Sequence, residues 1–196
     1  MAGSKHFYDT IRPVLFNGSI SSKQFEGTEA TLKACADGGV TDPRAVAYIL
    51  ATVYHECAKT MQPIEEYGKG AAYDYGKQLK MGGGKGKRVA YETPHQLYYG
   101  RGYVQLTWYE NYEVQGKRLG IDLLNHPELA LQPSVAGSIM ISGMTRGDFT
   151  GRKLGQFFTP TLTDYVGARK IINGQDKAGL IAGYAHTFFA ALAEPQ

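Results

Sequence analysis

The chain has 196 residues, of which 43% are hydrophobic and 20% are charged, and its formal net charge is +3. This length fits one domain or two small ones, and the composition excludes a disordered chain, a coiled coil and a collagen-like fibre. Two cysteines, Cys35 and Cys57, exclude a disulfide-dense scaffold, and the positive charge is smaller than that of dedicated nucleic-acid binders.

The N-terminal region predicts two helices. Residues 6–16 are typical of a short helix that Pro13 interrupts or shifts, and Asn17-Gly18 marks a turn. Residues 21–24 fit a capping box that opens a second helix, which ends near Gly38-Gly39. The same region lacks the apolar core of a secretory signal, and no apolar run reaches the roughly 18–20 residues of a membrane helix. We therefore expect a cytoplasmic protein without membrane insertion and with reduced cysteines.

The next element is a strongly apolar helix over residues 43–60. Asp42 is its expected N-cap and Pro43 its first helical residue. Because apolar side chains recur in it at helical spacing, we expect it to be the buried central helix, with the helical segment 1–41 packed on the core. His55-Glu56 falls near its C-terminal end.

The central region, residues 66–96, is rich in Gly, Tyr and Lys and predicts a long loop with a small hairpin. Its run 81–88 lacks the spacing of a phosphate-binding loop and is interpreted as a basic surface loop. Residues 100–112 alternate polar and apolar side chains. The chain as a whole is predicted to be mainly α-helical, with further helices over 113–119, 134–146, 162–172 and 176–192.

Glu56 is a candidate proton donor. Glutamate is rarely buried without a partner, and an apolar setting favours the protonated form of a carboxyl near neutral pH. A glutamate on the exposed face of the last helical turn is the alternative. Lys59 stands where a zinc-protease motif needs its second histidine, which excludes that site. His55 and Cys57 do not face each other on a helix, so they do not form a nucleophilic pair.

Glu65-Glu66 supplies candidates for a second carboxyl group. Glycosidic hydrolysis commonly uses two, one of which protonates the leaving oxygen while the other activates water or attacks the sugar. A chain that folds back after Pro63 could place Glu65 or Glu66 opposite Glu56. A solvated acidic pair in a loop is the alternative.

The segment GRGYVQLTWYENY mixes neutral polar and aromatic side chains. This mixture suits the binding of sugar hydroxyl and N-acetyl groups and the orientation of a water molecule, although a β-hairpin with ordinary cross-strand pairs would also fit. Asn173-Gly174 predicts a turn at a helix C-terminus. The polar and aromatic candidates in the segment are Tyr103, Gln105, Thr107, Trp108, Asn111 and Tyr112.

The order of these motifs resembles glycoside hydrolase family 19, and more closely the lysozyme-like bacteriophage endolysins of that family with Gram-negative hosts. The similarity runs from about residue 44 to residue 190 through AYILATVYHE, the glutamates, YYGRGYVQLTWYENY, LGIDLLNHPELAL and KIINGQ. It implies a mainly α, lysozyme-like, two-lobed fold with a substrate cleft, as a single catalytic domain over residues 1–196 with no separate wall-binding module. It also implies inverting hydrolysis of β-1,4 bonds between N-acetylmuramic acid and N-acetylglucosamine in peptidoglycan, for host cell lysis.

The same resemblance assigns roles to individual residues. Glu56 matches the general acid, and Thr107 matches the residue that holds the nucleophilic water. The second carboxylate is expected to be Glu66, because the pattern EEYGKGAAY resembles relatives that use the second glutamate of the pair. Glu65 is the alternative, because many family members place this carboxylate nine residues after the first, and residues 57–61 depart from the family pattern that follows His-Glu. No metal or organic cofactor is implied. The expected substrate-binding residues are His55, Tyr103, Gln105, Trp108, Asn111 and Asn173.

Three other functions remain open at this point: a chitinase, a lytic transglycosylase that uses Glu56 alone, and a non-catalytic wall-binding module. The expected partner is the peptidoglycan glycan strand and not nucleic acid, and the chain is expected to be a monomer. We expect it to stay in the host cytoplasm until lysis and then to act in the periplasm at the cell wall.

Overall fold

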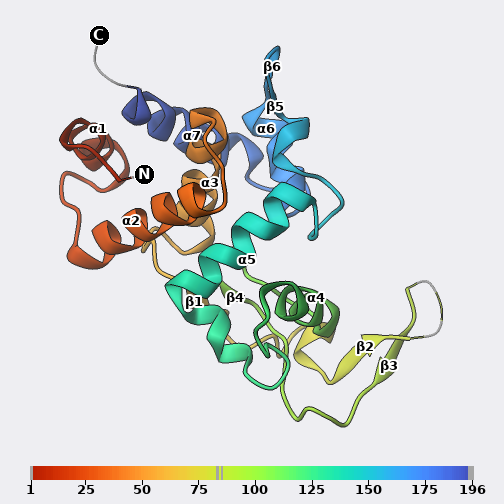
Figure 1. Ribbon diagram of the computed structural model, residues 1–196. Helices are drawn as coiled ribbons and strands as arrows, with labels where there is room; N and C mark the ends of the chain where they lie inside the picture. Colours follow the sequence, from red (N-terminus) through yellow and green to blue (C-terminus); the bar gives the residue numbers. More distant parts are fainter. Residues whose placement is uncertain (1, 83, 85, 194–196) are drawn as a thin grey trace. The chain divides into compact units, whose positions relative to one another are not determined.

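A computed structural model describes residues 2–82, 84 and 86–193. The chain divides into two compact units, Met1–Gln62 with Met140–Gln196 and Pro63–Ile139. Helices dominate the described residues, which confirms the mainly α prediction (Figure 1). The single catalytic domain over residues 1–196 stays a prediction.

The first unit is a helical body centred on α3 (Pro43–Glu56). Every residue of α3 from Ala45 to Tyr54 is buried, as the prediction of a central helix requires. It lies beside α7 (Ala178–Leu192), and α7 also contacts α1 (Lys5–Leu15) (Figure 1). The remaining elements are α2 (Ser22–Asp37), the C-terminal part of α5 (Pro133–Arg146), η3 (Leu154–Gln156), β5 (Phe158–Thr159), β6 (Leu162–Thr163), α6 (Tyr165–Ala168) and η4 (Arg169–Ile171).

Two predicted elements of this unit differ from the structure. Helix α1 is continuous, so the expected interruption by Pro13 is wrong. Only two residues follow this proline in the helix, and its missing N–H leaves just one carbonyl near the helix end without its usual partner. The predicted helix over 162–172 is confirmed only over residues 165–171, as α6 and η4, because strand β6 takes residues 162–163 and the helix starts at the Asp164 N-cap.

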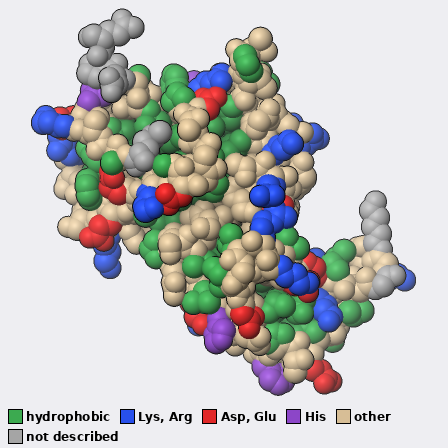
Figure 2. Space-filling view, in the orientation of Figure 1, with side chains coloured by type: hydrophobic (Ala, Val, Ile, Leu, Met, Phe, Trp, Pro, Cys, Tyr) green, Lys and Arg blue, Asp and Glu red, His purple; other side chains and the backbone are tan. Residues whose placement is uncertain are grey.

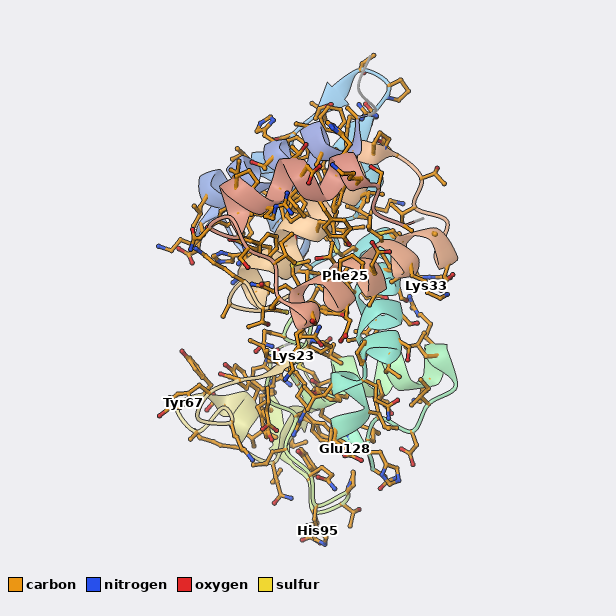
Figure 3. All side chains as sticks on the ribbon, turned by 90° about the vertical axis from the view of Figure 1, so that its left-hand side faces the viewer. Lys23, Phe25, Lys33, Tyr67, His95 and Glu128 are labelled. Carbon is orange, nitrogen blue, oxygen red and sulfur yellow. The ribbon has the colours of Figure 1, made fainter. Side chains whose placement is uncertain are left out.

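The start of α2 follows its local sequence. The side chain of Ser21 accepts a hydrogen bond from the backbone N–H of Gln24, and the Gln24 side chain returns a bond to the backbone of Ser21. This is the predicted capping box. Figure 3 labels Lys23, Phe25 and Lys33 along the helix.

Helix α3 ends at Glu56 and not at residue 60 as predicted. Ala58 and Lys59 follow with φ angles of 48° and 66°, which continue no right-handed helix. The turn packs closely on α2 at Gly27. If this residue had a side chain, its Cβ atom would lie only 1.8 Å from the carbonyl oxygen of Met61, which is too close for any side chain to fit. This glycine therefore permits the close approach of the turn, which makes Glu56 the last helical residue.

The cap of α3 leads to a stability prediction. The carboxylate of Asp42 accepts a hydrogen bond from the backbone N–H of Arg44 at 2.9 Å. Asp42→Ala should lower the free energy of unfolding by about 1 kcal/mol in urea titrations near pH 7. The matched control is Asp37→Ala, which removes an exposed carboxylate from the last turn of α2 and should cost no stability. Equal stability of the Asp42 variant and the wild type would contradict the assigned cap.

The pH dependence of this cap has a defined sign. Hydrogen bonds from Arg44 hold the pKa of the Asp42 carboxyl below its usual value of 3.8. A depressed pKa adds stability that is fully present above the usual value and is lost as the pH falls through the folded-state value. The difference between wild type and Asp42→Ala should therefore shrink below pH 4.

The second unit combines short strands with helices. Strand β1 (Ile64–Glu65) pairs antiparallel with β4 (Arg101–Gly102), with Glu65 opposite Arg101. The predicted small hairpin is confirmed as β2 (Leu79–Met81) and β3 (Arg88–Ala90). Residues 83 and 85 of the basic run lie outside the described residues. The unit also contains η1 (Asp74–Gly76), α4 (Tyr109–Leu119), η2 (Pro127–Leu131) and the N-terminal part of α5.

Helix α4 begins at Tyr109, four residues earlier than predicted. Trp108 precedes it with a φ angle of 72°, so the chain turns sharply into the helix. On the face shown in Figure 2, Lys and Arg side chains gather over α4 and the β2–β3 hairpin. Among the residues that the structure describes, no helix is both long and apolar enough to span a membrane.

Candidate active site

Glu56 lies at the C-terminal end of α3 in the first unit, and its side chain is 17% exposed. Its carboxylate forms an ion pair with the guanidinium of Arg169, whose side chain is only 3% exposed. Arg169 is held in turn, because its Nε donates to the carbonyl oxygen of Asp176 at 3.0 Å. Glu56 therefore does not lie in the purely apolar setting expected from the sequence, since a buried guanidinium faces its carboxylate.

Arg169 is not among the site residues predicted from the sequence. It lies four residues before Asn173, inside the segment that carries the family resemblance. A signal existed, because a long cationic side chain in an otherwise apolar helical stretch is rarely buried unless a carboxylate pairs with it. The partner could not be inferred, since 113 residues separate Arg169 from Glu56.

Two predicted substrate-binding residues belong to the same unit. Burial lowers the pKa of the His55 imidazole, so its neutral form predominates at pH 7 and can both donate and accept a hydrogen bond. Asn173 is exposed, and its Oδ1 accepts a hydrogen bond from the backbone N–H of Gly174 at 2.8 Å. The predicted turn is therefore present, while the roles of both side chains in substrate binding stay predictions.

Glu65 lies on β1 in the second unit, among cations. Its carboxylate accepts a hydrogen bond from the hydroxyl of Tyr99. The Nε of Arg101 lies 3.8 Å from it and the Nζ of Lys69 lies 3.7 Å from it. Two positively charged side chains and a hydroxyl group therefore surround this carboxylate, and the one from Arg101 comes from β4. These contacts indicate a structural role for Glu65 in joining β1 to β4.

Glu66 has a different environment, in which neutral donors hold both carboxylate oxygens. The hydroxyl of Tyr75 donates to Oε1 at 2.8 Å, and the backbone N–H of Gly100 donates to Oε2 at 3.0 Å. The backbone of Glu66 also donates to the carbonyl oxygen of Gly100 at 2.8 Å. No cation of the described residues pairs directly with these oxygens, and such a setting suits a carboxylate that must accept a proton from water.

The glycine at position 100 makes this arrangement possible. A Cβ there would lie 2.7 Å from Oε1 of Gln105 and 3.2 Å from Oε2 of Glu66. The side-chain amide of Gln105 donates to the carbonyl oxygens of Ile64 and Gly102 at 3.1 and 3.2 Å. Gln105 therefore braces the strand pair beside Glu66, and its predicted contact with substrate stays a prediction.

The remaining predicted residues of the second unit differ in accessibility. Thr107 is partly exposed, and its hydroxyl hydrogen-bonds to no side chain or backbone group in the described part of the chain, whereas its carbonyl accepts from Nδ2 of Asn111 at 2.8 Å. Tyr103 is fully buried, which does not favour direct contact with a sugar. The guanidinium of Arg88 covers one face of Trp108 at 3.5 Å from the ring centroid.

The structure thus forms two groups around the predicted carboxylates, each within its own unit and each including residues that the sequence did not single out. The first contains Glu56 with His55 and Arg169, and the second contains Glu66 with Gly100 and Gln105. Within residues 2–82, 84 and 86–193, no group of three or more His, Cys, Asp or Glu side chains could hold a metal ion. The chemistry available to these groups is proton transfer by carboxylates.

Comparison with known proteins places this chemistry in a family. The model of the family described as chitinase class I, glycoside hydrolase family 19, matches residues 18–145. An endochitinase of Arabidopsis thaliana is 32% identical over 136 residues, which cover 66% of this chain and 43% of the relative. An inactive chitinase-like protein of Hevea brasiliensis is 56% identical over 37 residues, 19% of this chain and 12% of the relative. The chain therefore spans less than half the length of these curated relatives.

The fold agrees with this match. The crystal structure of a bacterial family 19 chitinase superposes with a TM-score of 0.61 and 24% sequence identity, covering 100% of this chain and 97% of the other. At this identity the likeness establishes the fold, and it confirms the predicted fold class. The family match contains Glu56, Glu65, Glu66, Gln105 and Thr107, whereas Arg169 and Asn173 lie beyond it. The chain belongs to glycoside hydrolase family 19.

Proposed function

We propose that this chain hydrolyses the β-1,4 bonds between N-acetylmuramic acid and N-acetylglucosamine in peptidoglycan, and that it serves as the endolysin of a bacteriophage with a Gram-negative host. The observation that carries the catalytic part is the pair of contrasting carboxylates. Glu56 faces a buried guanidinium, while neutral donors orient both oxygens of Glu66. The resemblance of the motif order to phage endolysins supports the biological role.

In the proposed reaction Glu56 acts as the general acid. Its protonated carboxyl group donates to the glycosidic oxygen, and the C–O bond to the leaving sugar breaks. Glu56 becomes an anion in this step, and the positive charge of Arg169 stabilises that anion as it forms. The ion pair seen in the structure corresponds to the state of Glu56 after the proton has left.

Glu66 acts as the general base in the same step. It takes a proton from a water molecule, whose oxygen bonds to the anomeric carbon on the face opposite the leaving group. The Thr107 hydroxyl, which has no hydrogen-bond partner among the described residues, helps to orient this water. The products are two sugar chains, and the new reducing end has the inverted, α configuration.

A chitinase is the second candidate, and the names of the relatives favour it. Chitin has the same β-1,4 bond and N-acetyl groups but lacks the lactyl ether and peptide of peptidoglycan. One matched relative is named an inactive chitinase-like protein, so activity requires a direct test.

The deciding experiment is product analysis. Purified sacculi of a Gram-negative bacterium and chitin hexamer are digested in parallel, and the products are identified by mass spectrometry and by proton NMR of the first anomer formed. We expect soluble muropeptides with reducing N-acetylmuramic acid ends in the α configuration. Turnover of chitin alone would assign a chitinase, anhydro ends would assign a lytic transglycosylase, and binding to sacculi without products would assign a wall-binding module.

A further inference from the structure

Tyr75 is the one side chain whose hydroxyl reaches Glu66 among the hydrogen bonds of the described residues. It lies on η1, nine residues after Glu66, and donates to Oε1 at 2.8 Å. Burial and the neighbouring Glu66 carboxylate raise the pKa of the Tyr75 hydroxyl. The hydroxyl therefore keeps its proton throughout the working range of an enzyme and acts toward Glu66 as a donor.

The ring of Tyr75 is held on two sides. Tyr73 stacks on it with ring centroids 5.0 Å apart and an angle of 17°, and Trp108 meets it edge-on at 5.6 Å. Arg88 lies over the Trp108 ring and donates two hydrogen bonds to Glu110, at 2.9 and 2.8 Å. This sequence of contacts ties the position of Tyr75 to the start of α4 and to the β2–β3 hairpin.

The two donors on Glu66 act at different oxygens. The N–H of Gly100 belongs to the backbone and holds Oε2, so it cannot by itself set the rotation of the carboxylate about its last bond. The Tyr75 hydroxyl holds Oε1 and supplies the second point that defines this rotation. A hydrogen bond to a carboxylate also favours the ionised form, which is the form that a general base needs.

We propose that Tyr75 is a positioning residue for the general base: its hydroxyl holds the Glu66 carboxylate in the orientation required to deprotonate water. This proposal rests on the proposed function, in which Glu66 is the base. Trp108 supports the Tyr75 ring in this geometry, and its predicted contact with sugar stays a prediction.

The test is Tyr75→Phe, which removes the hydroxyl and keeps the ring in its stack. On peptidoglycan or a soluble glycan substrate, kcat should fall about tenfold, as expected for one lost hydrogen bond to a charged group, while KM should change less than about twofold. The acidic limb of the pH profile of kcat/KM should move to higher pH, because the ionised carboxylate loses a donor. A merely structural role would not move this limb.

Two matched variants serve as controls. Tyr73→Phe makes the same chemical change on the neighbouring, exposed ring, whose hydroxyl bonds to no described group, and should behave as wild type. Tyr99→Phe removes the hydroxyl that contacts Glu65 and should leave the pH profile unchanged. Circular dichroism and thermal melting of each variant establish that the fold is retained.

A second modification keeps the proposal testable if Tyr75→Phe folds poorly. Incorporation of 3-fluorotyrosine at position 75 keeps the shape of the side chain and makes the hydroxyl a stronger donor, so the acidic limb should move to lower pH. A wild-type kcat and pH profile in both variants would overturn the proposal, and so would a pH shift that appears in Tyr99→Phe instead.

The outcome for Glu66→Gln separates this proposal from the proposed function. If Glu66→Gln is inactive while both Tyr75 variants behave as wild type, Glu66 remains the base and the role of Tyr75 is refuted. If Glu66→Gln is as active as wild type, the proposed mechanism fails whatever the Tyr75 variants show.

Discussion

Replacing Glu56 with glutamine should lower kcat on peptidoglycan by about a thousandfold or more, because the variant retains the shape of the side chain but has no proton to donate. The amide oxygen of the new side chain can still accept a hydrogen bond from Arg169, so the fold should be kept. The measurement is the rate of muropeptide release from purified sacculi, with circular dichroism as the check on folding. Near-normal release by this variant would refute the assignment of the general acid.

Stability and catalysis can be separated at this position. Glu56→Gln removes the negative charge from a buried ion pair and leaves the Arg169 charge uncompensated, so its melting temperature should fall below that of wild type. The double variant Glu56→Gln with Arg169→Met should recover part of that loss, because the unpaired charge is removed as well. It should remain inactive. Recovery of activity together with stability would show that Glu56 has a structural role only.

The matched control for Glu56→Gln is Glu113→Gln. Glu113 lies on α4 and pairs with Lys117 at 2.8 Å on the helix surface, where both side chains are at least one-third exposed. The substitution makes the same chemical change outside the candidate site. It should leave both kcat and the melting temperature close to wild type, since exposed ion pairs contribute little to stability.

Glu66→Gln should lower kcat by about a hundredfold or more, whereas Glu65→Gln should retain most of the activity. The two carboxylates are adjacent in sequence but differ in their partners. Tyr75 and Gly100 orient Glu66, which pairs with no cation in the described part of the chain, while Arg101 and Lys69 lie within 4 Å of Glu65. A carboxylate shared by two cations is the poorer proton acceptor. The pair of variants is compared by muropeptide release and by melting temperature.

The reverse result would reassign the base. If Glu65→Gln is inactive and Glu66→Gln is active, with both variants folded, Glu65 activates the water and Glu66 is structural. Equal loss in both variants, accompanied by a fall in melting temperature for Glu65→Gln, would mean that the β1–β4 pair must be intact for the base to act.

The helix starts of the first unit could be predicted because their signals are local. Ser21 with Gln24 and Asp42 with Arg44 satisfy backbone donors within three residues, so their geometry depends on nothing distant. The buried face of α3 follows from apolar spacing for the same reason. Helix ends were less predictable. The end of α3 depends on a turn that packs against Gly27 of α2, which is a tertiary contact.

By itself, the sequence determined the mainly helical class, the central helix, the capped starts of α2 and α3, and the presence of Glu56 and the Glu65-Glu66 pair. The tertiary structure alone decided what surrounds each carboxylate. Arg169 reaches Glu56 across 113 residues, and Tyr75 reaches Glu66 through an irregular segment. Neither Arg169 nor Tyr75 could be inferred from helical or strand spacing in the sequence. Electrostatic environment depends on distance in space, and folding brings together charges and donors that no local pattern connects.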